Sequence, residues 1–185
     1  MGNCRVLVLV GSLRKASYSR MLARALERLA PASLEFEYAD IGHLPHYNQD
    51  IEDSGDLPES WLQFRQQVRS AGALLFVTPE YNRSIPGVLK NAIDIASRPK
   101  EENAWSGKPG AVVSISRGSL GGFGANHHLR QALTAVNVPV MAHPEAYIGN
   151  IATLFDEQGN LANESTAKFL SQFMRAFAQW VEKNR

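Results

Sequence analysis

The sequence RVLVLVGSLRKASYS, residues 5–19, changes abruptly from apolar to polar side chains. Every residue from Val6 to Val10 is valine or leucine, which is the pattern of a β-strand buried on both faces. Glycine, hydroxyl and basic residues follow at once. A stripe of apolar residues from Met21 to Leu29 then predicts a helix over 17–29, with the polar residues outside it. This order of strand, polar loop and helix is the unit by which we interpret the rest of the chain.

The same unit recurs along the sequence. Strands are predicted over 5–10, 34–38, 73–78, 110–116 and 138–141, and helices over 17–29, 58–71, 86–96, 125–136 and 166–183. Residues 40–57 show no period and are predicted to form a long loop. Strands that alternate with helices and are apolar throughout indicate a parallel sheet covered on both faces. Five such units suit an open, doubly wound sheet in one domain of residues 1–185, because an eight-stranded barrel needs about 250 residues.

The composition narrows the class of protein. Hydrophobic residues make up 44% of the chain and charged residues 20%, and 19 basic against 18 acidic residues leave a net charge of +1. This balance favours neither nucleic acid nor an anionic membrane as a partner. Cys4 is the only cysteine, so neither an intrachain disulfide nor a CxxC pair can form. The apolar run 6–10 is too short for a signal peptide or a membrane span. We therefore expect a cytoplasmic protein without membrane insertion.

The polar loop of residues 11–19 suits a phosphate group. The first N–H groups of a helix are free and the helix dipole favours an anion there. Hydrogen bonds can be added by Ser12, Ser17, Ser19 and Arg14. Neither GxxxxGK[ST] nor GxGxxG is present, which disfavours nucleoside triphosphates and the usual dinucleotide fingerprint. In the alternative interpretation, Ser17 only caps the helix and the basic side chains are solvated.

Two further loops follow predicted strands at the carboxyl edge of the sheet, where ligands of such sheets bind. In residues 79–87 (PEYNRSIPG), Tyr81 and Asn82 offer an aromatic face and an amide to a flat heteroaromatic ring, although a turn that caps the next helix explains them equally. Residues 116–124 (SRGSLGGFG) contain four glycines, which allow a ligand close to the backbone or simply form a flexible loop. Three such loops on one edge favour a ligand site.

Several motifs resemble those of the NAD(P)H-dependent FMN reductases, and in particular the bacterial quinone and chromate reductases. They are GSLRKxS at 11–17, LP at 44–45, YNQD at 47–50 and PEYNxSxPGxLKNAxD at 79–94. The resemblance covers nearly the whole chain in the same order. It implies a flavodoxin-like α/β fold, with a doubly wound five-stranded parallel sheet of order 2-1-3-4-5 and helices on both faces. It also implies a homodimer or homotetramer with each flavin near a subunit interface.

The resemblance further implies that FMN is held by the three loops at the carboxyl edge. The cofactor-binding residues predicted in this way are Ser12, Leu13, Arg14, Lys15, Ala16, Ser17, Tyr18, Ser19, Pro79, Glu80, Tyr81, Asn82, Ser116, Gly118 and Gly121. Two positions depart from the family pattern, since Ala16 replaces an expected glycine and Ser19 replaces the asparagine of many members.

The implied function is an FMN-dependent NAD(P)H oxidoreductase. It would pass hydride from NADH or NADPH through FMN to quinones or other easily reduced acceptors, including chromate or azo compounds. Because the flavin carries the chemistry, we expect no catalytic acid, base or nucleophile. We expect Arg14 to neutralise the phosphate, Asn82 to hold the ring edge and Tyr81 to cover the ring. The alternatives are a flavodoxin-type electron carrier, which the near-neutral charge disfavours, and an FMN-binding redox-sensing module.

Other chemistry-bearing residues receive structural interpretations. His127 and His128 are adjacent on a predicted helix and point about 100° apart, so they cannot face one metal ion and no metal site is expected. No GxSxG motif follows a strand, which disfavours a serine hydrolase. Cys4 is expected to be a small buried residue. Glu145 either joins a subunit contact, as the resemblance suggests, or is solvated. The aromatic stripe of residues 169–180 is expected to belong to the core.

Overall fold

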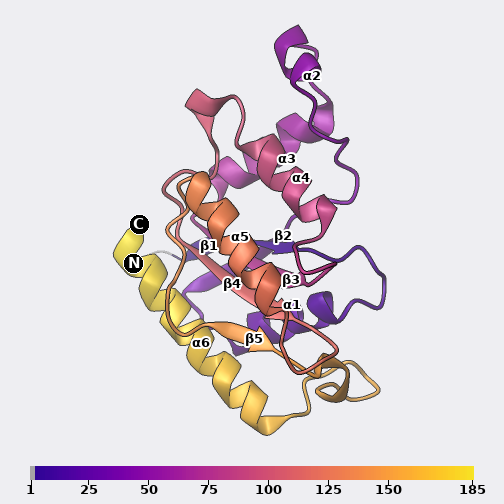
Figure 1. Ribbon diagram of the computed structural model, residues 1–185. Helices are drawn as coiled ribbons and strands as arrows, with labels where there is room; N and C mark the ends of the chain where they lie inside the picture. Colours follow the sequence, from indigo (N-terminus) through magenta and orange to yellow (C-terminus); the bar gives the residue numbers. More distant parts are fainter. Residues whose placement is uncertain (1–2) are drawn as a thin grey trace.

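The computed structural model describes residues 3–185 and shows helices packed on both faces of a parallel sheet (Figure 1). The strands are β1 (Cys4–Val10), β2 (Leu34–Tyr38), β3 (Ala73–Pro79), β4 (Gly110–Ile115) and β5 (Ala146–Ile148). The helices are α1 (Tyr18–Leu29), α2 (Gln49–Ser54), α3 (Glu59–Ser70), α4 (Gly87–Ala96), α5 (Phe123–Ala135) and α6 (Glu164–Asn184), with short 3₁₀ turns at Lys100–Glu102 and Ile151–Thr153. The strand order β2-β1-β3-β4-β5 confirms the predicted flavodoxin-like fold.

The core consists of two apolar layers, one on each face of the sheet. Side chains of successive strand residues point to opposite faces. Along β1, Val6, Val8 and Val10 therefore join the layer that contains α1 and α6, whereas Leu7 and Leu9 join the layer of α3, α4 and α5. All five side chains are at most 4% exposed, because β1 lies inside the sheet between β2 and β3. This burial explains why the run from residue 6 to residue 10 has no polar alternation.

The closing helix and the single cysteine behave as the sequence predicts. Phe173 and Phe177 of α6 are fully buried, and Phe169 and Trp180 pack partly buried against the same layer. The Trp180 indole also donates a hydrogen bond to the Pro139 carbonyl at 2.9 Å. Cys4 lies in β1 and is buried, and desolvation raises the pKa of its thiol. The thiol is thus a small core group that stays protonated at neutral pH.

The predicted fifth strand over 138–141 is wrong. That segment makes one bridge to the start of β4, where Gly110 donates to the Pro139 carbonyl at 3.0 Å and Met141 donates to the Gly110 carbonyl at 2.8 Å. The chain then runs on to β5, which pairs with the carboxyl-terminal half of β4. The apolar residues of 138–141 are thus explained by packing at the sheet edge rather than by strand pairing.

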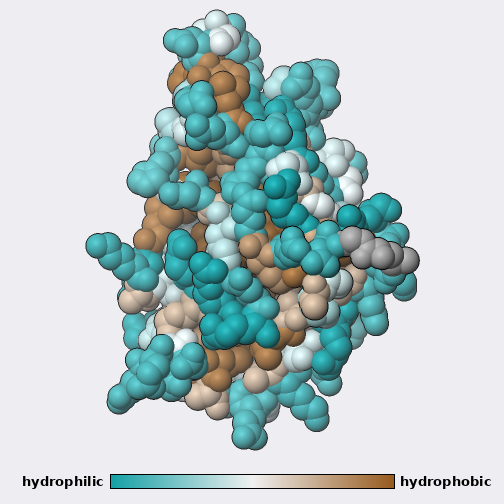
Figure 2. All heavy atoms as spheres, turned by 180° about the vertical axis from the view of Figure 1, so that it is seen from behind, coloured by the Kyte–Doolittle hydropathy of each residue, from teal (hydrophilic) through white to brown (hydrophobic). Residues whose placement is uncertain are grey.

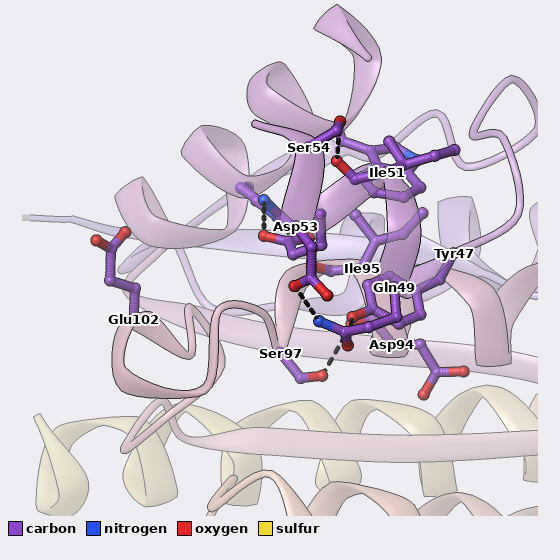
Figure 3. Close-up of polar contacts among 12 residues, drawn as sticks. Tyr47, Gln49, Ile51, Asp53, Ser54, Asp94, Ile95, Ser97 and Glu102 are labelled. Atoms are coloured by element: carbon purple, nitrogen blue, oxygen red, sulfur yellow. Dashed lines mark hydrogen bonds and ion pairs between the residues drawn. The ribbon is translucent and has the colours of Figure 1, made fainter. Parts of the chain in front are cut away.

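The predicted long loop of residues 40–57 contains α2, which projects from the rest of the molecule (Figure 1). The Asn48 side chain caps the helix by accepting from the Asp50 N–H at 2.9 Å, and Gly55 ends it with a left-handed φ of 75°. Figure 3 shows Gln49 between two partners on this segment, since it accepts from the Tyr47 hydroxyl at 2.6 Å and donates to Asp53 at 2.7 Å. The Asn48 side-chain cap and the left-handed Gly55, not apolar periodicity, define the two ends of this helix.

A buried ion pair fixes the projecting segment to the core. Arg65 of α3 is 2% exposed and donates to Glu52 of α2 through two nitrogens, one of them at 3.1 Å, while its Nε donates to the Ile95 carbonyl at 2.9 Å. Seen from behind, hydrophobic residues reach the surface close to this projecting end (Figure 2). The segment is therefore anchored through Glu52 of α2, although α2 has no buried residue.

Replacing a buried phenylalanine of α6 tests the core assignment. We expect Phe177→Ala to lower the free energy of unfolding by about 3–5 kcal/mol, because it removes a fully buried ring and leaves a cavity. The matched control is Leu62→Ala on α3, whose side chain is 44% exposed and whose loss should cost less than about 1 kcal/mol. Denaturant unfolding followed by circular dichroism measures both, and equal losses in the two variants would contradict the assignment.

Candidate functional site

The loops after β1, β3 and β4 meet at the carboxyl edge of the sheet around a cavity of about 320 Å³. Its lining residues are Ser12, Arg14, Ser17, Tyr18, Ser19, Pro79, Glu80, Tyr81, Ile115, Ser116, Arg117 and Ile151. The volume is at the lower end of the range for small-molecule sites. The edge is the one where parallel sheets bind ligands, next to the reversal of strand order at β1 and β3.

The end of β1 is packed too closely for any side chain. Gly11 donates to the Val77 carbonyl at 2.9 Å, and a Cβ built on it would lie 2.9 Å from the Thr78 hydroxyl and 3.2 Å from Cδ of Pro79. Any other residue would therefore push the first loop away from the third strand. Glycine here brings the loops after β1 and β3 into contact and closes one side of the cavity.

The N-terminus of α1 is suited to an anion. The Ser17 hydroxyl accepts from the Arg20 N–H at 3.4 Å and caps the helix, and no acidic residue lies in the first turn. Arg14 and Lys15 are exposed and form no ion pair with any residue in the range 3–185. Free N–H groups, the positive end of the dipole and the unpaired Arg14 thus lie at the same cavity. Ser17 is a helix cap, as the alternative interpretation held, and the capacity for an anion remains beside it.

Ser19 provides the sharpest indication of a ligand. Its side chain is 1% exposed and its hydroxyl has no hydrogen-bond partner within the part of the chain that the structure describes. A buried hydroxyl without a partner is unfavourable by about 1–3 kcal/mol, and such groups are rare. Because Ser19 also lines the cavity, a ligand oxygen placed there would satisfy the hydroxyl. A phosphate group fits this donor together with the free N–H groups of α1.

The loop after β3 forms a tight turn beside the cavity. Tyr81 and Ser84 exchange backbone hydrogen bonds of 2.9 and 3.0 Å, and Asn82 and Arg83 between them have left-handed φ angles of 50° and 65°. The Tyr81 ring is 45% exposed at the cavity. An exposed aromatic face on a rigid turn can cover a flat ring.

The glycine-rich loop after β4 is held in place. Gly121 has a φ of 61°, and a Cβ on it would overlap the backbone of Tyr147 in β5. Its carbonyl accepts from the Ser114 hydroxyl at 2.8 Å, and the buried Asn126 amide donates to that hydroxyl at 3.0 Å. The loop is therefore packed against β5, and Gly121 and Gly122 serve close backbone approach rather than flexibility, whereas a Cβ on Gly118 would meet nothing within 4 Å.

The structure brings most of the predicted cofactor-binding residues to one cavity. Those that line it are Ser12, Arg14, Ser17, Tyr18, Ser19, Pro79, Glu80, Tyr81 and Ser116. Those that do not are Leu13, Lys15, Ala16, Asn82, Gly118 and Gly121. Sequence reasoning missed Ile115, Arg117 and Ile151. The first two flank the predicted Ser116 and could have been found from the end of the strand, whereas Ile151 follows the strand that the sequence misplaced.

The two adjacent histidines contact different partners. His127 lies 3.1 Å from the Tyr147 hydroxyl, and His128 lies 3.0 Å from the Ser84 hydroxyl. Burial, together with a hydrogen bond to Glu145, raises the pKa of Tyr147 to about 12, so this hydroxyl is protonated at neutral pH. No group of three or more metal-ligating side chains is arranged to hold a metal ion in residues 3–185.

Comparison with known proteins identifies the family to which this chain belongs. Residues 4–153 match the family described as NADPH-dependent FMN reductase. The chain belongs to this family. It is 57% identical over 180 residues to a quinone reductase of Pseudomonas putida, with 97% of this chain and 96% of the relative covered. It is 46% identical over 181 residues to a 2-hydroxy-1,4-benzoquinone reductase of a Burkholderia species, with 98% of each covered.

A solved structure extends the comparison to the fold. FerB of Paracoccus denitrificans, described as a flavoenzyme NAD(P)H:(acceptor) oxidoreductase, superposes with a TM-score of 0.91 at 45% identity, and the match covers 98% of each chain. As a member of the FMN reductase family, the protein is an oxidoreductase that works with FMN and NAD(P)H. Among residues 3–185, none of the helices combines the length and the apolar character that a membrane crossing requires.

Two serines of the α1 terminus should affect the ligand-free enzyme differently. Ser19→Ala should leave its free energy of unfolding unchanged or raise it, because the replaced hydroxyl is buried without a partner. Ser17→Ala should lower it by about 0.5–1 kcal/mol, because a helix cap is lost. Thermal unfolding of both variants without FMN measures the difference. A Ser19→Ala variant that is less stable than Ser17→Ala would show that Ser19 has a structural partner.

Proposed function

We propose that this protein transfers electrons from NADH or NADPH to quinones through FMN held in the cavity at the carboxyl edge, with residues 1–185 forming one FMN-binding domain. The observation that carries the proposal is the partnerless hydroxyl of Ser19, buried in that cavity beside the acid-free N-terminus of α1. Family membership supplies FMN, and this feature supports a place for its phosphate.

The phosphate end of the cofactor is proposed to lie on the loop after β1. There the Ser12 and Ser19 hydroxyls and the free N–H groups of α1 would hold the phosphate oxygens, and the Arg14 guanidinium would offset their charge. Ser12 is 5% exposed whereas Arg14 is exposed, so the site combines a buried hydroxyl with a solvated guanidinium. Such a site is specific for phosphate through its geometry rather than through charge alone.

The flavin ring is proposed to lie between the loops after β3 and β4. The Tyr81 ring would cover one face or its entrance, the backbone of residues 79–82 would hold one edge, and Ser116 and Arg117 would border the other side. FMN supplies the redox chemistry when bound, and the protein binds it, orients it and sets its access to solvent. The exposure of Tyr81 leaves room for the nicotinamide and then the acceptor to approach in turn.

Quinones are proposed as acceptors because of the relatives. The Pseudomonas putida and Burkholderia proteins, at 57% and 46% identity over nearly the full chain, are named for quinone substrates. The proposed site has the openness that reduction of small planar acceptors requires, since Tyr81 is 45% exposed.

We also propose that the enzyme is a cytoplasmic homo-oligomer. Three large hydrophobic side chains on or directly after the loops that flank the cavity are exposed, namely Leu13 (50%) and Leu120 (62%) on loops and Phe123 (54%) at the start of α5. Exposed hydrophobic side chains grouped at one edge are typical of subunit contacts. The single cysteine, which excludes an intrachain disulfide, supports a reducing compartment.

Flavin reduction tests the proposed function directly. We expect the FMN-loaded protein to lose its flavin absorbance on addition of NADPH or NADH under anaerobic conditions, and to regain it on addition of 1,4-benzoquinone. Failure of both nicotinamides to bleach the flavin would favour an electron carrier and defeat the enzyme proposal.

Arg14→Ala should weaken FMN binding about tenfold in a fluorescence titration, because one charged contact to the phosphate is lost.

Mass measurement in solution tests the oligomer. The wild-type protein should elute with the mass of two or four chains, and Phe123→Glu should shift it toward 20.4 kDa, the mass of one chain, because a charge at an apolar contact is unfavourable. Leu62→Glu on α3, where the replaced side chain is 44% exposed, is the matched control and should not dissociate the oligomer. A wild-type monomer would contradict the proposal.

A further inference from the structure

Glu80 joins the two loops that flank the proposed flavin ring. It follows β3 and lines the cavity, and its side chain is 14% exposed. Its Oε2 atom accepts from the backbone N–H of Ala125, in the first turn of α5, at 3.0 Å. A carboxylate in the loop after β3 thus contacts the helix that begins directly after the glycine-rich loop of β4.

Helix α5 has no cap of its own. Its N-cap residue is Gly122, which has no side chain to accept a hydrogen bond, and its first turn contains no acidic residue. The first N–H groups of a helix need acceptors, and a carboxylate there also interacts favourably with the dipole. The Glu80 carboxylate provides a hydrogen-bond acceptor and a negative charge at this helix terminus, from a position 45 residues away from Ala125 along the chain.

The helix is shaped to receive this carboxylate. A Cβ on Gly124 would lie 3.0 Å from Oε2 of Glu80 and 2.9 Å from the Arg83 carbonyl oxygen, so the close approach requires glycine. A second contact, 3.0 Å between Ser84 and His128, joins the other end of the turn to α5. The Arg83 guanidinium, 3.5 Å from the other Glu80 oxygen, is 79% exposed at its side chain and adds little.

The turn that Glu80 holds is intrinsically unfavourable. Asn82 and Arg83 both adopt left-handed φ angles, which non-glycine residues rarely do and which persist only where the surroundings impose them. The Tyr81–Ser84 backbone hydrogen bonds close the turn, and the contacts of Glu80 and Ser84 with α5 fix it to the rest of the protein. The position of the Tyr81 ring over the cavity therefore depends on this attachment.

We propose that Glu80 is a positioning residue for the flavin: its carboxylate caps α5 and thereby holds the loops after β3 and β4 at the separation that the ring requires. The proposal rests on the proposed function, since it assumes that FMN binds in this cavity. Glu80 acts through the backbone of α5 and the turn at residues 81–84, and the position of its oxygen matters more than its charge.

Three substitutions separate position from charge. Glu80→Gln keeps an oxygen at the same reach, Glu80→Asp keeps the charge on a side chain one methylene shorter, and Glu80→Ala removes both. We expect FMN dissociation constants, measured by flavin fluorescence in a titration of the apoprotein, to rise about 10–100-fold in the Ala and Asp variants and less than about fivefold in the Gln variant. Visible circular dichroism of the bound flavin should change in the Ala and Asp variants and be retained in Gln.

Controls keep the result interpretable. Glu182→Ala removes an exposed carboxylate near the end of α6, beside the start of β1 at the opposite edge of the sheet, and should leave FMN binding and the dichroism unchanged. Where Glu80→Ala does not fold, the comparison of Gln with Asp decides by itself. The positioning role would be overturned by equal affinity and equal flavin dichroism in wild type and Glu80→Asp, or by equal losses in Glu80→Gln and Glu80→Asp. In either case, FMN binding by the wild-type protein would still support the proposed function. Absence of FMN binding by the wild-type protein would overturn the proposed function and this inference with it.

Discussion

The lack of space at the end of β1 is the constraint on which the cavity depends. Gly11 lies so close to Thr78 and Pro79 that no side chain fits, and this contact lets the loops after the two central strands meet. Because β1 and β3 are buried inside the sheet, neither can move to relieve a clash. The position of the α1 N-terminus relative to the turn at residues 81–84 follows from that rigid contact.

The α1 terminus combines two features that oppose stability in the ligand-free protein. Its first turn has no acidic residue to offset the dipole, and the Ser19 hydroxyl is buried without a partner. A bound phosphate would satisfy both at once, so part of its binding energy would come from relief of an existing cost. The loops after β3 and β4 are held by other contacts, through Ser114 and Asn126 behind Gly121 and through Glu80 on α5. The site is thus assembled from loops that the protein's own contacts fix to one another.

Apolar patterns predicted the frame well, because burial on both faces of β1 and β3 leaves an unmistakable run of Val and Leu. Apolar patterns failed where edge packing, side-chain caps or tertiary contacts determine the structure. Val140 looks like a strand residue but makes a single bridge, while the three residues of β5 are too few to show a period. Helix α2 is formed by the Asn48 cap and Gly55, signals that were present in the sequence without an apolar stripe. The partnerless state of Ser19 and the contact of Glu80 with Ala125 arise only from tertiary packing.

The central claim is that the phosphate of FMN lies at the N-terminus of α1. A crystal structure of the protein with FMN tests it most directly. The account predicts a phosphate oxygen within hydrogen-bond distance of the Ser19 hydroxyl and of the first N–H groups of α1, with the ring between the loops after β3 and β4. FMN bound with its phosphate away from Ser19, so that the hydroxyl remains without a partner, would contradict it.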